Sequence, residues 1–445
     1  VHAVSHLDDT HMPTREEIFR ASMRPLPRGI KLASLAAAAL GLLIFLIGVF
    51  VSPDRAWRAF HFNWLFFAAF SSAGVMFVAV QRIVTARWSR PIIRFLEGYV
   101  AFLPVAFLFL VLSLTLGYEH IFPQARVTPP AYEKQVYLAP GFHVGRALLV
   151  FGIITLLSVW YVWKCVRLDV GLLPDDRAGW ARGFRERMRR GFREERREIH
   201  STHSSQGWHA VILALVFGYG WTSLAFDLSM SLDLHFQSTL YGWWFFMGAW
   251  VVALMIFSLL VMAWRRYLNV YDLVTEHHIH DLGKLCFAFT AFWGYLTFGQ
   301  YLIIWYGNMA EETHWARLRL IDPWKGITLA VVFLAFVLPF FGLMSRAAKV
   351  FLPTFVLFSL CGILGHYLVR YDEVYPSLYG VAEHVPFGLW EIGALLLYAG
   401  TWGACYMAFM DAVPRMRTTL MTSPFRDEVQ VPVNPKTMEP LPAHE

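Results

Sequence analysis

The residues of this sequence that could do chemistry are ionisable side chains inside or beside long apolar segments. A charged group within a membrane is costly unless it is paired or hydrated, so such groups commonly mark proton or ion pathways. We therefore predict a proton path. Its candidate residues are Glu97, Asp227, Asp233, His280, Lys284, His366 and Glu391.

Several of these candidates also have an interpretation without proton transfer. Glu97 follows Arg94 by three residues, so the two can form an ion pair on one helix face. Lys284 can extend its ammonium group to the membrane surface, and His366 can form a hydrogen bond between helices. Glu391 lies within an otherwise apolar segment and is harder to explain in this way.

No ligand set for a metal or a haem is visible. His366 is the only histidine deep in an apolar segment, whereas haem b in a helical bundle needs histidines on facing helices. No cysteine has a second cysteine within three residues, which excludes Cys-x-x-Cys sites. The cysteines are Cys165, Cys286, Cys361 and Cys405. We expect no catalytic residue, no metal and no cofactor bound by this chain itself, while a quinone ligand stays open.

The composition places these residues in a membrane protein. Of the 445 residues, 57% are hydrophobic and only 16% are charged, and the mean hydropathy is +0.46. Soluble proteins carry about 25% charged residues, so a soluble enzyme is excluded. The net charge of +6 does not indicate nucleic acid, because Lys and Arg occupy short stretches between apolar segments.

Ten apolar segments have about the 20 residues that a helix needs to cross a bilayer. They are 30–51, 63–84, 95–117, 144–166, 208–228, 241–263, 282–305, 327–344, 349–369 and 387–410. We therefore predict an all-α integral membrane protein with ten transmembrane helices. An even number of spans puts both termini on the same side.

The distribution of Lys and Arg predicts the orientation, because cytoplasmic loops carry an excess of both residues. The side of the N-terminus carries most of them, including Arg426 and Lys436 of the C-terminal tail. The opposite side has only Arg55, Arg58, Arg126, Lys134, Arg317, Arg319, Lys325 and Arg370. Both termini are therefore predicted to be cytoplasmic.

The longest connection, residues 167–206, is basic and contains the near-repeat GFRERMRR–GFREERRE at 183–198. Trp180, Phe184, Met188 and Phe192 recur every fourth residue, which places them on one helical face. We predict an amphipathic helix on the cytoplasmic surface of the membrane, with a solvated charged helix or loop as the alternative. The sequence thus divides into a cytoplasmic N-terminal segment 1–29, spans 30–166, the basic connection 167–206, spans 207–410 and a cytoplasmic tail 411–445.

Two stretches are more specific than composition: AFDLSMSLDLHFQSTLYGWWFFMG at 225–248 and HDLGKLCFAFTAFWGYLTFGQYLIIWYGNMAEET at 280–313. Both resemble the ActF-type membrane subunit of alternative complex III, a bacterial quinol-oxidising complex. PFFGLMSRAAK at 339–349 and RYDEVYP at 370–376 support the resemblance, which covers about 220–400. Leu234, Gly299 and the pair Met309-Ala310 depart from the family pattern.

The resemblance implies a fold similar to NrfD-like (polysulfide-reductase-type) membrane subunits, with two four-helix bundles plus two further helices. It also implies partners: an ActC-type paralogue, an iron–sulfur protein and c-type cytochromes, so that haem c and iron–sulfur clusters are expected in the partner subunits. In the family the quinol site is usually associated with the ActC-type chain, and the ActF-type chain is thought to help conduct protons. The expected location is the bacterial cytoplasmic membrane, in contact with lipid and the quinone pool and without nucleic acid.

The matched stretches contain acidic residues with two interpretations. Asp227 and Asp233, with Ser229, Ser231 and His235, can form a polar cap that orders the turn after the fifth span, or the outer mouth of a proton path.

We therefore expect a membrane subunit, without its own redox cofactor, of a respiratory or photosynthetic quinol:electron-acceptor oxidoreductase that contributes to proton translocation or to assembly. The alternative is a secondary transporter, in which Pro104, Pro339 and Pro353 would kink spans.

Overall fold

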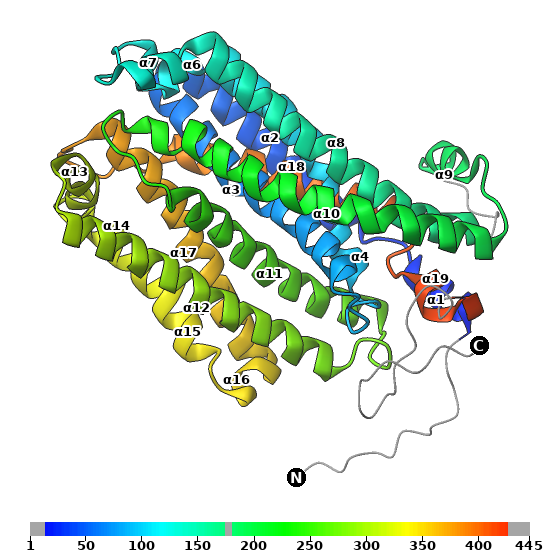
Figure 1. Cartoon of the computed structure of the whole chain (residues 1–445). Coiled ribbons are helices and arrows are strands. Elements are labelled where there is room, and N and C mark those ends of the chain that lie inside the picture. Colours follow the sequence, from blue (N-terminus) through cyan, green and yellow to red (C-terminus); the bar gives the residue numbers. More distant parts are fainter. Residues whose placement is uncertain (1–13, 174–179, 426–445) are drawn as a thin grey trace.

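A computed structural model describes residues 14–173 and 180–425 (Figure 1). In these ranges all regular structure is helical, and ten helical runs are long and apolar enough to cross a membrane. The chain is a multi-pass membrane protein. The runs are α2 (Arg28–Val51), α3 (Pro53–Ile83), α4 (Ile93–Glu97) with η1 (Gly98–Phe102) and α5 (Leu103–Thr115), α8 (Pro140–Leu172), α10 (Glu195–Leu228), α11 (Tyr241–Leu268), α12 (Glu276–Gly307), α14 (Lys325–Val331) with η4 (Val332–Val337) and α15 (Leu338–Gly342), α17 (Leu352–Tyr379) and α18 (Leu389–Ala412).

All ten predicted spans are present, but several helices extend well beyond the apolar segments. The helix α3 begins at Pro53 rather than 63, and α17 continues to Tyr379 rather than ending at 369. A helical backbone satisfies its own hydrogen bonds, so it continues through polar residues wherever their side chains find partners. Hydropathy alone does not detect these extensions.

The helices α3 and α11 form the buried centre of the molecule. The helix α3 packs against α5, α10, α11, α17 and α18, and α11 packs against α10, α12 and α17. Outside this centre, α8 lies along α10, and α14, η4 and α15 lie along α17 (Figure 1).

The first and last spans, α2 and α18, pack closely along each other. A Cβ added to Gly400 of α18 would lie 2.3 Å from the backbone nitrogen of Ala38, and one added to Gly41 of α2 would lie 2.2 Å from that of Leu397. Glycines at such crossings let two helix backbones approach within a membrane.

Two of the three prolines expected to kink spans adjoin irregular helix. Pro104 follows the 3₁₀ stretch η1, and Pro339 follows the π-helical stretch η4. Pro353 instead lies in the first turn of α17, where proline is compatible with a straight helix.

The two ends of the molecule carry different short elements. The α1 end holds α1 (Arg15–Ser22) and α19 (Thr418–Thr422), which contact each other, together with α9 (Arg182–Arg189). The opposite end, here the α13 end, holds α6 (Tyr118–Ile121), η2 (Pro123–Ala125), α7 (Tyr132–Tyr137), η3 (Met230–Leu232) and α13 (Ala310–Arg319) (Figure 1). The short α16 (Arg346–Val350) joins α15 to α17. The first and last described helices thus share one end of the molecule, as an even number of spans requires.

The amphipathic helix is shorter than the repeat predicts. The helices α8 and α10 take up both ends of 167–206, and α9 is only eight residues long. Gly191 has a φ of +68°, so it separates Phe192 from α9. Met188 is buried and Phe184 packs edge-on against Trp163 of α8, while Trp180 is exposed before the helix begins. The predicted apolar face of Trp180, Phe184, Met188 and Phe192 is therefore divided among three segments of the chain.

Parts of the predicted terminal segments, 1–13 and 426–445 with Arg426 and Lys436, lie outside the described residues.

Candidate functional site

A buried ion pair lies in the last turns of α17, toward the α13 end. Arg370 Nη1 is 2.8 Å from Glu373 Oε2, and both side chains are buried. Ser229 donates to the same carboxylate oxygen over 3.0 Å, and the Tyr241 hydroxyl lies 2.7 Å from Ser229 Oγ. The other oxygen, Glu373 Oε1, has no hydrogen-bond partner among the described residues. One oxygen of this carboxylate is therefore fixed by hydrogen bonds, and the other is available to accept one.

A second pair lies beside the first and connects α13 to α17. The Arg319 guanidinium donates to the backbone carbonyls of Asp372 over 2.9 Å and Glu373 over 3.0 Å. Its Nε is 3.7 Å from Asp372 Oδ2, and Thr328 donates a 3.2 Å hydrogen bond to the other oxygen, Asp372 Oδ1. Burial lowers the pKa of Arg319. These contacts fix the end of α13 against the end of α17.

Glu373 also faces a pocket of about 450 Å³ enclosed by α11, α12, α13, α14, η4 and α17. Its aromatic lining consists of Trp244, Trp293, Phe298, Tyr301, Trp315 and Phe336. Its polar lining is small and includes Gln300, whose Oε1 is buried without a partner among the described residues. A mostly apolar pocket of this volume with a few convergent polar groups has the character of a small-molecule site.

His366 lies one turn before the ion pair, near the middle of α17. Its Nδ1 donates to the Gly362 carbonyl over 2.9 Å, because a carbonyl oxygen can only accept. Its Nε2 is therefore the ring nitrogen left to accept a proton, and it has no partner in the described part of the chain. The His366 ring is 4.7 Å from that of Trp293, which lines the pocket. The hydrogen bond between helices that the sequence suggested is replaced by one within α17.

A small void separates His366 and Arg370 from α3 and α11. Its volume is about 10 Å³, and Gly248 lies on its wall. This is close to the smallest space that holds one water molecule. A Cβ at Gly248 would lie 3.1 Å from Trp293 Nε1, 3.2 Å from Arg370 Nη2 and 3.3 Å from His366 Cδ2. Glycine at this position leaves room for three polar groups to converge.

Asp227, the next candidate, is buried and paired with Arg146 of α8, with distances of 2.7 and 2.9 Å. The carbonyls at the end of α10 are capped by two histidines. His143 Nε2 is 2.8 Å from the Asp227 carbonyl, and His61 Nε2 is 2.7 Å from that of Leu228. Both histidines are fully buried, so His366 is not the only histidine shielded from solvent. They lie in the polar extensions of α3 and α8, outside or at the edge of the apolar segments.

Asp233 has the turn-ordering role suggested for it and lies apart from the buried pairs. Its Oδ1 accepts hydrogen bonds from the backbone N–H groups of His235 and Phe236, at 3.0 and 3.2 Å. Lys134 donates to the Leu234 carbonyl over 2.8 Å from the other side, and burial lowers the pKa of Lys134. The turn is thereby fixed at the α13 end.

Glu391 is fully buried, and four hydrogen bonds engage its carboxylate. Arg55 contributes two over 2.8 Å, the Tyr375 hydroxyl one over 2.9 Å, and the Gly388 N–H one over 2.7 Å. Because no oxygen is left without a donor, this arrangement favours an ion pair that anchors the start of α18.

Glu97 lies at the α1 end in a network of two carboxylates and two arginines. Arg94 contacts both Glu97 and Asp169. Arg417 also contacts Glu97, and its Nε lies 2.8 Å from Glu97 Oε1. The predicted pair of Arg94 and Glu97 is thus present, with a second arginine from beyond α18. Burial is the largest single influence and lowers the pKa of Arg417, but Glu97, Cys165 and Tyr161 together raise it above its usual value.

His280 and Lys284 do not join the buried network. Lys284 is exposed and pairs with Asp281 over 2.6 Å, and His280 is half-buried at the start of α12. The interpretation of Lys284 as a surface cation fits this geometry.

The residues that the sequence reasoning missed are Arg370, Asp372, Glu373 and Arg319. The ninth apolar segment was predicted to end at 369, which placed the first three residues in a loop, although they continue α17. Two signals were available in the sequence around RYDEVYP. Arg370 and Glu373 are three residues apart, and Tyr367, Tyr371 and Tyr375 recur every fourth residue.

Residues 14–173 and 180–425 contain no group of three His, Cys, Asp or Glu side chains that could hold a metal ion. The chain matches no protein-family model and no curated protein. Its function is therefore argued from the geometry of the α17 site: a carboxylate with one available oxygen, a histidine with one available nitrogen, a water-sized void and an apolar pocket.

Proposed function

We propose that this chain is a proton-conducting membrane subunit, of ActF type, in a quinol:electron-acceptor oxidoreductase of the alternative complex III type. The observation that carries the proposal is the α17 site, where Glu373 Oε1, His366 Nε2 and Trp293 Nε1 are buried without hydrogen-bond partners among the described residues. Polar groups of this kind within a membrane are costly, and they are typical of proton relays.

The proton-carrying groups follow one another along α17. Glu373 faces the pocket, Arg370 is paired with Glu373 and lines the void, and His366 lines the same void one turn earlier on α17. One water molecule in the void would be close to His366 and Arg370. Glu373 can accept a proton on Oε1, and His366 can accept one on Nε2.

The pocket beside Glu373 fits the ring of a quinol. Tryptophan and tyrosine side chains give it flat apolar walls, and Gln300 Oε1 and Glu373 Oε1 can accept hydrogen bonds from ring hydroxyl groups. A quinol bound in this pocket would release its two hydroxyl protons there as its two electrons pass to redox centres of the partner subunits. The residues of this chain would orient the ring and receive protons at Glu373.

The packing supports a grouping into two four-helix bundles plus two helices. The first bundle is α3, α4–α5, α8 and α10, the second is α11, α12, α14–α15 and α17, and the closely packed α2 and α18 are the additional pair. We place this protein in the bacterial cytoplasmic membrane beside an ActC-type paralogue, an iron–sulfur protein and c-type cytochromes.

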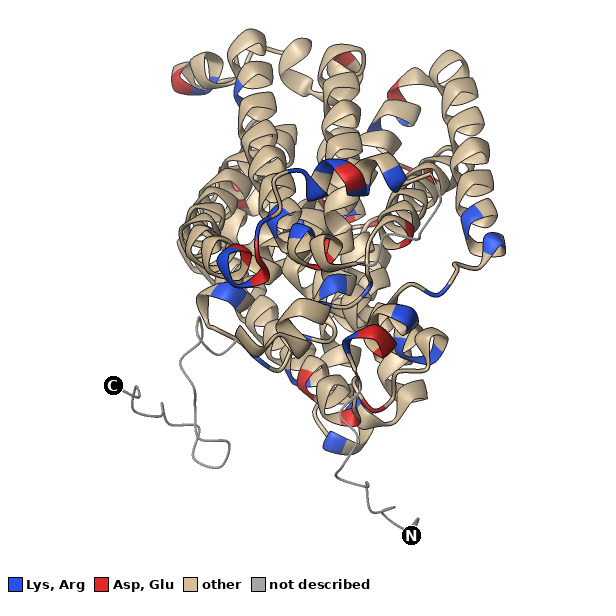
Figure 2. Cartoon of the chain, turned by 90° about the vertical axis from the view of Figure 1, so that its right-hand side faces the viewer, with Lys and Arg blue, Asp and Glu red and all other residues tan. Residues whose placement is uncertain are grey.

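The orientation is part of the same proposal. Figure 2 looks onto the α1 end, where Lys and Arg of several separate helices gather. By the positive-inside rule this end faces the cytoplasm. The α17 site then lies in the outer half of the membrane, on the side from which a quinol-oxidising complex releases protons.

The test is the ratio of protons translocated to electrons transferred by the intact complex in liposomes. Glu373→Gln and His366→Ala should lower this ratio, because each removes a proton acceptor. Glu311→Gln changes an exposed carboxylate of α13 and should leave the ratio unchanged. An unchanged ratio in both α17 variants, with electron transfer intact, would refute the proton-conducting role.

A secondary transporter is the second candidate, and the π-helical stretch η4 favours it. The residues Val332 and Phe336 of η4 line the pocket, and transporters often bind solutes at interrupted helices. Uptake of a solute into vesicles that contain only this chain would support the transporter and exclude the oxidoreductase subunit.

A further inference from the structure

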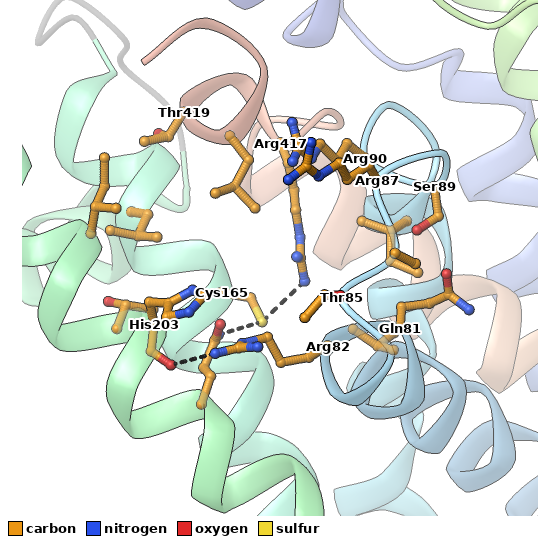
Figure 3. Close-up of a pocket in the computed structure, with 18 of the residues that line it drawn as sticks. Gln81, Arg82, Thr85, Arg87, Ser89, Arg90, Cys165, His203, Arg417 and Thr419 are labelled. Carbon is orange, nitrogen blue, oxygen red and sulfur yellow. Dashed lines mark hydrogen bonds between the residues drawn. The ribbon is translucent and has the colours of Figure 1, made fainter. Parts of the chain in front are cut away.

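A separate pocket lies at the α1 end, with a volume of about 800 Å³. It is enclosed by the end of α3, the loop that follows, α8, α10 and the segment around α19 (Figure 3). The proton path does not use this pocket, and its chemistry differs from that of the α17 site.

The lining of this pocket combines apolar side chains with cationic and hydrogen-bonding ones. Among the described residues that line it, four are arginines and one, Asp169, is a carboxylate. Asp169 is paired with Arg94, and Arg417 is paired with Glu97. The lining arginines are Arg82, Arg87, Arg90 and Arg417, and further polar groups come from Gln81, Thr85, Ser89, His203 and Thr419 (Figure 3).

Arg82 is the critical residue, because its charge is not matched. Among the described residues no carboxylate lies within 4.0 Å of Arg82, and its recorded hydrogen bond is a 2.9 Å contact from Nη2 to the His203 carbonyl. Its Nε is buried without a partner in the same part of the chain. The acceptor oxygen of neighbouring Gln81 is likewise buried and unpartnered there. A half-buried guanidinium without a counter-charge among the described residues favours an anion.

Exposed apolar side chains at the end of α3 lie at the cavity, which suggests the source of the anion. Val84 lines the cavity and is 59% exposed, and Ile83 beside it is 44% exposed. These residues end the membrane span α3, so hydrocarbon chains can lie against them while a headgroup enters the pocket. Basic pockets between transmembrane helices bind the phosphates of anionic lipids in this way.

We infer that this pocket binds a phosphate group through Arg82, and that the group belongs to an anionic phospholipid such as phosphatidylglycerol. Arg87, Arg90 and Arg417 line the same cavity, and each of them also has another partner in the protein. The hydroxyl groups of Thr85 and Ser89 add hydrogen-bond donors.

The test is the thermal stability of the full chain in mild detergent, titrated with phosphatidylglycerol, with phosphatidylcholine or with inorganic phosphate. Phosphatidylglycerol should stabilise the chain more than phosphatidylcholine. Arg82→Gln should weaken the apparent affinity for phosphatidylglycerol about fivefold, which corresponds to about 1 kcal/mol for one basic residue. Arg187→Gln, an exposed arginine of α9 at the same end, is the matched control and should change nothing.

The two phosphate sources give distinguishable results. Stabilisation by inorganic phosphate that Arg82→Gln abolishes would support the phosphate site and assign it to a soluble ligand. If Arg82→Gln does not fold, Arg82→Lys keeps the charge and should keep the preference for phosphatidylglycerol. Equal responses of the native chain to phosphatidylglycerol and phosphatidylcholine, with no response to phosphate, would overturn the inference. So would an unchanged affinity in Arg82→Gln.

Discussion

At the scale of single residues, the buried carboxylates of this protein are compensated by arginines from other turns or helices. Glu391 is matched by Arg55, and Asp227 by Arg146. A charge within a membrane is tolerated when a partner and hydrogen bonds satisfy it, so these pairs need no transport function. Glu373 differs because one of its oxygens has no donor in the described chain and faces a pocket. This difference singles it out among the acids.

The first prediction concerns the pair of Glu373 and Arg370. Glu373→Gln leaves the buried guanidinium without its counter-charge, so the free energy of unfolding should fall by about 3 kcal/mol. Equilibrium unfolding in a denaturing detergent measures this change. Adding Arg370→Met to Glu373→Gln should recover part of the loss, since an apolar residue needs no partner. A loss as small as that of the exposed control Glu311→Gln would contradict the pair.

The second prediction concerns Gly248. Gly248→Ala places a methyl group against Trp293, Arg370 and His366, which should cost about 1–3 kcal/mol and fill the water-sized void. Proton release by the reconstituted complex should slow while electron transfer continues. Gly299→Ala on α12 is the control, because its Cβ would meet nothing closer than 3.9 Å. Equal proton release in both variants would show that the void is not part of the path.

At the scale of helices, apolar length predicted all ten spans but not their ends. Apolar composition indicates which residues can lie in the lipid hydrocarbon. The polar ends of α3 and α17 are helical because their side chains form hydrogen bonds with other helices. His61 reaches the end of α10, and Arg370 reaches the Phe245 carbonyl. Such long-range contacts cannot be deduced from a hydropathy pattern.

The same limit applies to the candidate site. His366 was predicted from its depth, and the structure places it beside the void. Its neighbours Arg370 and Glu373 were missed because they follow the apolar segment. Lys284 was a candidate because it lies at the start of an apolar segment, but its side chain is exposed. Position along the chain indicates depth, and only packing shows which face of a helix is buried.

The third prediction concerns the contact between α2 and α18. Gly400→Val would push a branched side chain into the backbone around Ala38, so the free energy of unfolding should fall by about 2 kcal/mol or more. Gly29→Ala in α2 meets nothing within 4 Å and serves as the control. Equilibrium unfolding compares the two variants, and equal stability would mean that the helices do not cross there.

At the scale of the whole molecule, the chain has a net charge of +6, and its Lys and Arg residues are unevenly distributed between the two ends. The α1 end carries the basic pocket, and the α13 end carries the loops beside the α17 site. An orientation with the α1 end in the cytoplasm places the basic pocket among the lipids of the inner leaflet.

The fourth prediction tests this orientation. In a chain whose four cysteines are replaced by alanine, Glu311→Cys should react with a membrane-impermeant maleimide added to intact spheroplasts. Arg187→Cys on α9 should react only after lysis. Both positions are exposed, so access to the reagent is limited by the membrane alone. The reverse labelling pattern would invert the orientation and place the α17 site in the cytoplasmic half.

The most direct test of the proposed function is purification of this chain, by an affinity tag, from the membranes of its natural host in mild detergent. Covalently bound haem, non-haem iron and the accompanying polypeptides are then measured. A proton-conducting subunit of a quinol:electron-acceptor oxidoreductase should copurify with c-type haem, an iron–sulfur protein and a second polytopic subunit. Recovery of the chain alone, without haem or iron, would contradict the proposal.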